Sequence, residues 1–304
     1  MFDLTGKRAL ITGSTQGIGL AIAKCFREAG AEVIIHGATS EDKCIAATRE
    51  VGCNQYIVKN LADADAAEVI YAETGDVDIL VLNGDLLDCY AISKFSKLYR
   101  DSPIEEMIGA RQYLINLIEY IRPSKVIVTY GNHCLRLGSY LSSRLDTDIQ
   151  ELLPETALDY LFVDGFTHYD RKLKTKTYYE PIRDVFEDIK IEYTGNWHCQ
   201  IFDTIFCHPK AFASNPMKTA EKAMYFFRNE GKQFKTLVMA HTHRTGSYTI
   251  GNTTIYEQGA ACETDKMNYT DGMLINSQKQ GFIYLCYDKD GNCMPEKTKL
   301  VTLN

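Results

Sequence analysis

Seven side chains that can bind a metal or carry a proton follow short apolar segments in the middle and C-terminal parts of the chain. They are Asp85 and Asp88 in GDLLD, Asn132 and His133 in GNH, His208 in CHP, and His241 and His243 in AHTH. Four of the seven histidines fall in these motifs, so chance scatter explains them poorly. Imidazole nitrogen combined with carboxylate and amide oxygen suits Mn, Fe, Zn or Ni better than a calcium cage. The pattern therefore predicts a divalent-metal site.

Apolar strands must position these side chains. The expected strands are Ile79–Asn83, Val126–Tyr130, Thr204–Cys207 and Thr236–Met239, and each is followed directly by one of the motifs. In α/β architectures, sites form where the carboxyl ends of strands meet. We therefore expect the motifs to converge at one edge of a sheet.

A second candidate site lies near the N-terminus, where Thr12–Gly19 reads TGSTQGIG. A short apolar strand precedes it at Arg8–Thr12, and helical periodicity follows over Ile18–Ala29. Strand, glycine turn and helix is the arrangement that holds a pyrophosphate, because the turn allows close backbone approach and the helix N-terminus offers free N–H groups. The predicted nucleotide-binding residues are Gly13, Ser14, Gly17, Ile18 and Gly19.

Residues from about Phe2 to Asn83 resemble the short-chain dehydrogenase/reductase family, through LTGKRALITGSTQGIG and the DVDILVLN strand. The resemblance implies NAD(P) at the glycine turn. The second strand ends His36-Gly37-Ala38, without the acidic residue that would favour NAD, and Lys43 or Ser14 could suit NADP. That family's catalytic Tyr-xxx-Lys lies far later in the chain. Tyr90 and Lys94 match its spacing, but they are interpreted as a coincidence.

Residues from about Val77 onward resemble the calcineurin-like metallophosphoesterase family. The resemblance implies hydrolysis of a phosphoester, with a nucleotide or nucleic acid among the substrates. By the family's motifs, Asp85 would bridge two metals, and His243 would bind the second. Asn132, His208 and His241 would complete the first metal position. His133 would protonate the leaving oxygen, oriented by Asp88.

The family's opening Asp-x-His motif is missing. The corresponding strand ends Asn60-Leu61-Ala62, although Asp63 or Asp65 lies near enough in sequence to substitute. The expected site therefore holds one ion or two, and the expected hydrolase is impaired. An NAD(P)-dependent oxidoreductase and an inactive fusion are the alternatives.

The predicted fold is α/β: a Rossmann-like βαβ start continuing into a metallophosphoesterase-type two-sheet sandwich flanked by helices. The expected domains are residues 1–83 and 84–304. With 304 residues and 45% apolar content, the chain can bury one large core or two modest ones.

Composition limits the partners and the compartment. A net charge of −7 gives no support to a broad nucleic-acid or membrane surface, so the basic stretch Arg171–Lys176 is interpreted as solvated surface. No window is apolar enough to span a membrane. Ten cysteines without a CxxC pair indicate free thiols and a cytoplasmic location. The oligomeric state is left open.

Overall fold

The structure is a computed structural model. It describes residues 4–5, 7–11, 14–37, 41–58, 77–95, 102–262 and 278–303. The chain divides into two compact units, Met1–Val69 and Ile70–Asn304, and each is described by itself.

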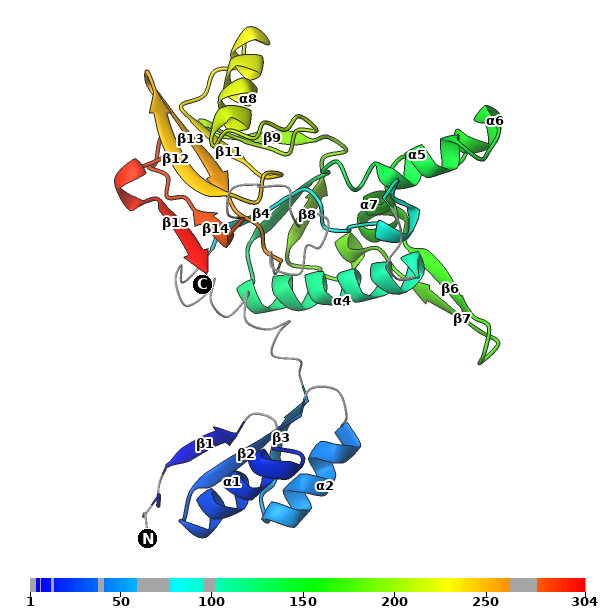
Figure 1. Cartoon of the computed structure of the whole chain (residues 1–304), viewed down its shortest axis with the longest axis vertical. Coiled ribbons are helices and arrows are strands. Elements are labelled where there is room, and N and C mark those ends of the chain that lie inside the picture. Colours follow the sequence, from blue (N-terminus) through cyan, green and yellow to red (C-terminus); the bar gives the residue numbers. More distant parts are fainter. Residues whose placement is uncertain are drawn as a thin grey trace. The chain divides into compact units, whose positions relative to one another are not determined.

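In its described residues, the first unit consists of a parallel sheet and two helices (Figure 1). Its strands pair in the order β1-β2-β3, and its elements are β1 (Arg8–Ile11), α1 (Gly17–Glu28), β2 (Glu32–Gly37), α2 (Glu41–Val51) and β3 (Gln55–Val58). The buried core consists of small and β-branched side chains from both layers, among them Ala23, Val33, Ile35 and Ala47. This confirms the predicted Rossmann-like α/β start.

A five-stranded sheet forms one part of the second unit. Its order is β12-β13-β11-β10-β9, with bounds β9 (His198–Ile201), β10 (Thr204–Cys207), β11 (Thr236–Met239), β12 (Thr245–Ile250) and β13 (Thr253–Gln258). The three central strands are parallel and the two edge strands antiparallel. Helix α8 (Lys218–Asn229) covers one face, where Met224 and Phe227 pack against Ile205 and Leu237.

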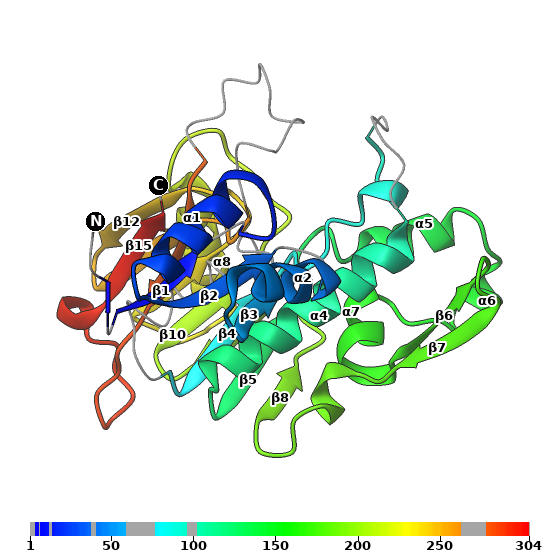
Figure 2. The same ribbon diagram turned by 90° about the horizontal axis from the view of Figure 1, so that it is seen from below.

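A three-stranded parallel sheet forms the other part, in the order β4-β5-β8. Its strands are β4 (Ile79–Asn83), β5 (Lys125–Thr129) and β8 (Lys190–Tyr193). Helix α4 (Pro103–Ile121) lies alongside this sheet (Figures 1 and 2). The face of the five-stranded sheet away from α8 packs against Val81 of β4 through Phe206, Val238 and Tyr256. The motif-bearing ends of β4, β5, β10 and β11 thus belong to two sheets in contact.

The start and end of α4 follow from local chemistry. The hydroxyl of Ser102 accepts a hydrogen bond from the Glu105 backbone N–H, and Pro103 occupies the first turn. A proline costs no hydrogen bond there, because that N–H has no partner within the helix. Arg122 then adopts a left-handed conformation with φ of +52° and ends the helix.

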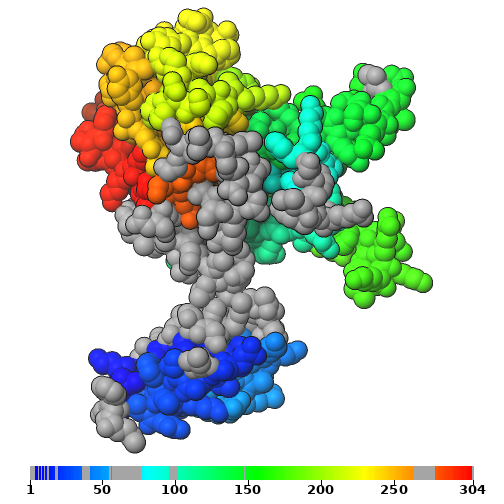
Figure 3. Space-filling model, in the orientation of Figure 1, coloured from blue at the N-terminus to red at the C-terminus, as the bar shows by residue number. Residues whose placement is uncertain are grey.

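The remaining elements surround the sheets. They are η1 (Tyr90–Ile92), α5 (Arg136–Ser142), α6 (Thr147–Gln150), α7 (Ala157–Asp159), η2 (Tyr160–Asp164), β6 (Phe166–Asp170), β7 (Thr175–Tyr179), η3 (Ile182–Asp184), β14 (Gln280–Tyr284), η6 (Pro295–Lys297) and β15 (Lys299–Leu303). Strands β6 and β7 form a hairpin that projects from the second unit, shown in light green in Figure 3. Strands β14 and β15 form an antiparallel pair.

The division between the units differs from the predicted boundary between Asn83 and Gly84. Among the described strands, β4 pairs with β5 and with no strand of the first sheet. The Val81 side chain of β4 packs into the core of the second unit, so β4 belongs to that unit. Gly13, the Asn60-Leu61-Ala62 segment, Asp63 and Asp65 lie outside the described residues.

All ten cysteines are free thiols. In the described part of the chain, no helix combines the length and apolarity needed to cross a membrane.

Candidate functional site

Asp85 is brought into the site by a sharp change of backbone direction after β4. Gly84 and Asp85 both have left-handed conformations, with φ of +82° and +48°. Left-handed backbone is rare outside glycine and is concentrated at functional sites. A Cβ on Gly84 would collide with the His208 ring, and one on Gly131 would collide with the Asp85 carboxylate. Both positions therefore need glycine so that the chain segments can approach closely.

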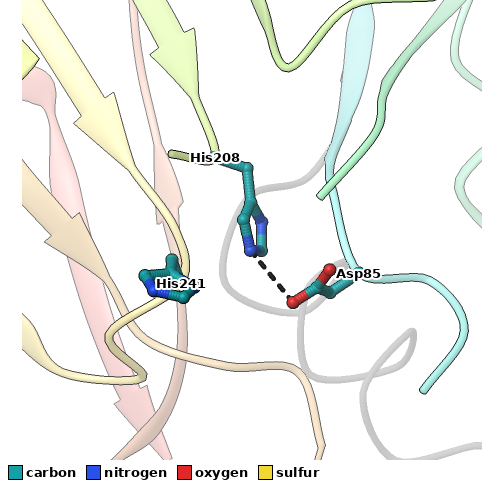
Figure 4. A group of neighbouring side chains, drawn as sticks. All are labelled: Asp85, His208 and His241. Atoms are coloured by element: carbon teal, nitrogen blue, oxygen red, sulfur yellow. Dashed lines mark ion pairs between the residues drawn. The ribbon is translucent and has the colours of Figure 1, made fainter. Parts of the chain in front are cut away.

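Three side chains from three strand ends meet at this point (Figure 4). One ligand atom from each of Asp85, His208 and His241 lies within 4.8 Å of the other two. The Asp85 Oδ2 atom is 3.0 Å from His208 Nε2, and the amide Oδ1 of Asn132 is 3.2 Å from the same nitrogen. Four of the predicted metal ligands thus lie around one point.

The orientation of His208 favours a cation there. Its Nδ1 lies 2.9 Å from the backbone carbonyl of Asn83, which can only accept, so Nδ1 carries the proton. In the neutral ring, Nε2 then presents a lone pair toward Asp85 Oδ2 and Asn132 Oδ1, which are also acceptors. Three converging acceptors need a positive charge between them, either a second proton on the ring or a metal ion. A backbone carbonyl on the far nitrogen is the usual partner of a metal-binding histidine.

His241 supplies a further vacant ligand atom. Its buried Nε2 has no hydrogen-bond partner among the described residues, and its backbone φ is +92°. Burial lowers the pKa of His241 to about 4, assisted by the nearby His208. The imidazole is therefore neutral at physiological pH, the form that binds metal. An unpartnered buried nitrogen costs free energy in the absence of a ligand.

Asp85 stays ionised at this position. Burial raises its pKa, but the adjacent imidazoles of His208 and His133 outweigh it, and the pKa falls to about 2. The other oxygen, Oδ1, accepts from the backbone N–H of His133 at 2.8 Å. The carboxylate is thus held in place by both neighbouring motifs.

His133 and Asp88 form the predicted imidazole–carboxylate pair. His133 Nδ1 lies 3.0 Å from Asp88 Oδ1, and Nε2 lies 3.8 Å from Asp85 Oδ2. Arg136 also donates to Asp88 Oδ1 at 2.7 Å. Burial raises the pKa of Asp88, but the hydrogen bond from His133 and the charge of Arg136 lower it overall. This arrangement directs one nitrogen of His133 toward the metal-ligand group, where it can exchange a proton.

His243 lies outside the group of mutually close ligand atoms. Its Nδ1 is 3.4 Å from Gln278 Nε2, and burial lowers its pKa to about 4. The structure thus brings together four of the five predicted metal ligands.

Sequence reasoning missed Asn83 and Arg136. The buried Asn83 amide donates to Gln258 and to the Cys207 carbonyl and accepts from Thr129, which links four strands behind His208. Asn83 ends an apolar strand immediately before the GDLLD motif, which is a usable signal. Arg136 comes three residues after His133, a spacing that places two side chains close together on a helical turn.

The two buried imidazoles predict a pH-dependent stability. The folded pKa values of His241 and His243 are about 4, below the ordinary 6.5, so the unfolded chain binds more protons between those values. Stability therefore rises with pH across that window, is fully present above pH 6.5, and is lost as the pH falls to 4. We expect urea unfolding without metal to show a loss of up to about 3 kcal/mol per imidazole. The double variant His241→Ala/His243→Ala should show a much shallower slope, and an equal slope would contradict the assignment.

The glycine turn of the first unit precedes α1 as predicted. Gly17 has φ of +60°, and a Cβ there would meet no atom within 4 Å. Gln16 is the N-cap, and its side chain makes no capping hydrogen bond. Ser14 is buried, and Ile18 and Gly19 lie in the first turn of α1. The helix N-terminus thus follows directly on the turn, as phosphate binding requires.

Tyr90 and Lys94 do not form a Tyr-xxx-Lys pair on a helix. Tyr90 begins the three-residue η1, which ends at Ile92, and the C-cap Ser93 is extended. A lysine four residues after a tyrosine lies beside it only on a continuous α-helix. Tyr90 and Lys94 therefore do not lie on one helix.

Residues 7–121 match the family model described as short chain dehydrogenase. The chain is 38% identical over 95 residues to 2-dehydro-3-deoxy-D-gluconate 5-dehydrogenase of Formosa agariphila, a match that covers 29% of this chain and 36% of that protein. It is 33% identical over 117 residues to gluconate 5-dehydrogenase of Gluconobacter oxydans, covering 36% and 46%. The chain thus spans less than half the length of these curated relatives.

A solved structure of 3-oxoacyl (acyl-carrier-protein) reductase from Agrobacterium tumefaciens with NADP bound is 26% identical. That match covers 47% of this chain and 59% of the other, with a TM-score of 0.20, too low to support an argument.

These findings overturn the prediction of a phosphoester hydrolase. The matched family and relatives are oxidoreductases, and no metallophosphoesterase family model matches the chain. The prediction rested on the metal-ligand motifs at the strand ends, whereas the similarity to known proteins lies in the N-terminal segment. Residues 7–121, which include β4 and α4, match the short chain dehydrogenase family.

Proposed function

We propose that the protein binds NAD(P) through its N-terminal unit, in the manner of the short-chain dehydrogenase family, and has the oxidoreductase function of that family. The observation that carries the proposal is the parallel β1-β2-β3 sheet with a glycine turn between β1 and α1, inside the segment that matches the family model. Glycines there let the backbone approach a pyrophosphate, and the N-terminus of α1 favours its negative charge.

The described end of β2 favours NADP over NAD. An acidic side chain at this strand end usually binds the ribose 2′-hydroxyl of NAD. The last residue of β2 here is Gly37, which has no side chain. Lys43, in the first turn of α2, is the nearby cation proposed for a 2′-phosphate. We therefore expect NADPH to bind at least as tightly as NADH.

Titration of the protein with NADPH, followed by nicotinamide fluorescence, tests the proposal. We expect saturable binding that Gly17→Val weakens at least tenfold, because valine rarely adopts a positive φ and would distort the turn. Gly52→Val is the matched control. Gly52 also has a positive φ of +73°, and a Cβ added there would meet no atom within 4 Å. Gly52 follows the C-terminal end of α2 and is not part of the glycine turn. Equal loss in both variants, or no NADPH binding by the wild type, would refute the proposal.

We also propose that the second unit binds a divalent cation at Asp85, Asn132, His208 and His241. The supporting observation is the unpartnered Nε2 of His241, next to a His208 ring whose Nε2 faces two acceptors. A bound ion would supply a positive charge and acidify a coordinated water. His133, held by Asp88, would exchange a proton beside it. The two facing sheets of the second unit, packed through Phe206 and Val81, hold the ligand-bearing strand ends together.

Metal analysis of protein purified without chelator tests the second proposal. We expect about one Mn, Fe, Zn or Ni ion per chain, and none in Asp85→Asn, which keeps the side-chain shape but removes the charge. His198→Ala is a control on a histidine outside the group. Loss of NADPH binding in Gly17→Val with retained metal would show that the two proposals are independent.

A further inference from the structure

The hairpin of β6 and β7 is firmly anchored at its base. Phe166 and Tyr179 lie opposite each other in the register, and their rings stack with centroids 5.0 Å apart. Arg111 of α4 donates to the backbone carbonyl of Glu180 at 2.9 Å. Its guanidinium also lies over the Tyr179 ring, 5.9 Å from the centroid. These contacts hold the base of the hairpin in place against α4.

The tip of the hairpin is a basic cluster, defined as Arg171, Lys172, Lys174 and Lys176. All four side chains are exposed, and no ion pair among the described residues includes any of them. The one carboxylate at the tip, Asp170, accepts from the backbone N–H groups of Lys172 and Leu173 at 2.8 and 3.0 Å. These two hydrogen bonds lower the pKa of Asp170. The tip therefore concentrates positive charge on a chain whose net charge is −7.

One face of the hairpin presents two tyrosines to solvent. Alternate residues of paired strands share a face, so Tyr169 and Lys176, which are opposite each other, lie on the same side as Thr167 and Tyr178. Tyr169 is 48% exposed and Tyr178 is 62% exposed. The Tyr178 hydroxyl donates to the Asp164 carbonyl at 3.2 Å, and Gly165 leaves room for the ring. The Tyr178 ring is thus held in one orientation while its surface stays open.

We propose that this hairpin binds single-stranded nucleic acid. Exposed aromatic rings provide stacking surfaces for unpaired bases, and neighbouring cations neutralise the phosphates that connect them. Tyr169 and Lys176 lie opposite each other across the two strands, so a ring for a base and a cation for a phosphate are neighbours on one face. Fixed rings lose little conformational entropy on binding. An anionic membrane would use the cations but not the tyrosine face, and a polypeptide of acidic residues such as poly-glutamate would have no aromatic ring to stack on the tyrosines.

Fluorescence anisotropy with a labelled oligo(dT) of about 20 nucleotides tests the proposal. We expect binding that weakens with salt, since strands release counterions when phosphates are neutralised. Replacing the basic cluster with glutamine should weaken binding at least tenfold and reduce the slope of log K against log salt by about 2 to 3. Tyr169→Ala/Tyr178→Ala should weaken binding at least tenfold, whereas Tyr169→Phe/Tyr178→Phe, which keeps both rings and loses the Tyr178 hydroxyl contact to Asp164, should retain most of the binding.

The matched control replaces four exposed lysines on other elements, Lys222, Lys232, Lys289 and Lys297, with glutamine. This change alters the net charge equally and should leave oligo(dT) binding within twofold. Equal weakening in this control would show a general charge effect and overturn the assignment. Tyrosine-independent binding, or binding to anionic phosphatidylserine vesicles or poly-glutamate in preference to oligo(dT), would also overturn it. Far-ultraviolet circular dichroism of each variant checks that the fold is retained.

Discussion

We expect Mn²⁺ or Zn²⁺ to raise the unfolding temperature of the wild-type protein by roughly 5–10 °C at 100 times the dissociation constant, and His241→Ala to abolish the rise. An ion bound only by the folded state adds about 2.7 kcal/mol under these conditions. The His241 Nε2 has no hydrogen-bond partner among the described residues, so its removal breaks no hydrogen bond seen there. The variant also loses ring contacts with His208 and Phe212, so its metal-free stability can change, and the test is the metal-dependent rise alone. Calorimetry with and without chelator measures both quantities.

His198→Ala is the matched control for this experiment. His198 also has a buried nitrogen without a hydrogen-bond partner among the described residues, and burial lowers its pKa. It packs against Trp197 and Phe227, in an aromatic cluster beneath α8. Its removal should lower stability through lost packing yet preserve the metal-dependent increase. If His241→Ala kept the increase, the ligand group would be assigned incorrectly.

We expect Gly84→Ala to destabilise the second unit by about 2–5 kcal/mol and to remove the proposed metal binding. A left-handed alanine alone costs about 1–2 kcal/mol. In addition, the new methyl would overlap the His208 ring, which cannot move without losing its hydrogen bond to the Asn83 carbonyl and its close contact with Asp85. Chemical denaturation gives the change in free energy of unfolding, and metal analysis gives the loss of the site.

Gly195→Ala separates the two contributions. Gly195 has a φ of +60°, and a Cβ there would meet no atom within 4 Å. The control therefore carries the backbone cost without the collision and should lose only about 1–2 kcal/mol, with normal metal content. Equal losses in both variants would mean that the close contact between Gly84 and His208 is not important for stability.

Local sequence patterns predicted most of the elements that position the site. The apolar segments before GDLLD, CHP and AHTH form β4, β10 and β11 within one residue of their expected bounds. Their prediction succeeded because strand formation here depends on short apolar runs ended by polar turns. The strand before the glycine turn was predicted for the same reason, and α1 was predicted from its helical periodicity. The boundary between the units was not, because strand pairing decides it and β4 is apolar enough for either sheet.

Function was harder to infer than fold. The ligand-like residues led to a prediction of phosphoester hydrolysis, which the similarity of residues 7–121 to oxidoreductases contradicts. Motif residues identify what chemistry is available, but not which reaction a family performs. The sequence alone indicates that the basic stretch Arg171–Lys176 is solvated surface. It cannot indicate that Lys176 shares a face with Tyr169 and Tyr178, because that depends on the hairpin register.

The sequence by itself determined the residue types that can bind a nucleotide or a metal, and the strand or turn on which each one lies. Only the tertiary structure decided which of them meet. Asp85 and His241 are separated by more than half of the chain, and their distance depends on two sheets packing through Phe206, Val238 and Val81. The tertiary structure also places the Asn83 carbonyl against His208 Nδ1, and it leaves His243 outside the group of ligand atoms formed with Asp85 and His241. Such contacts follow from sheet order and packing, which no local pattern specifies.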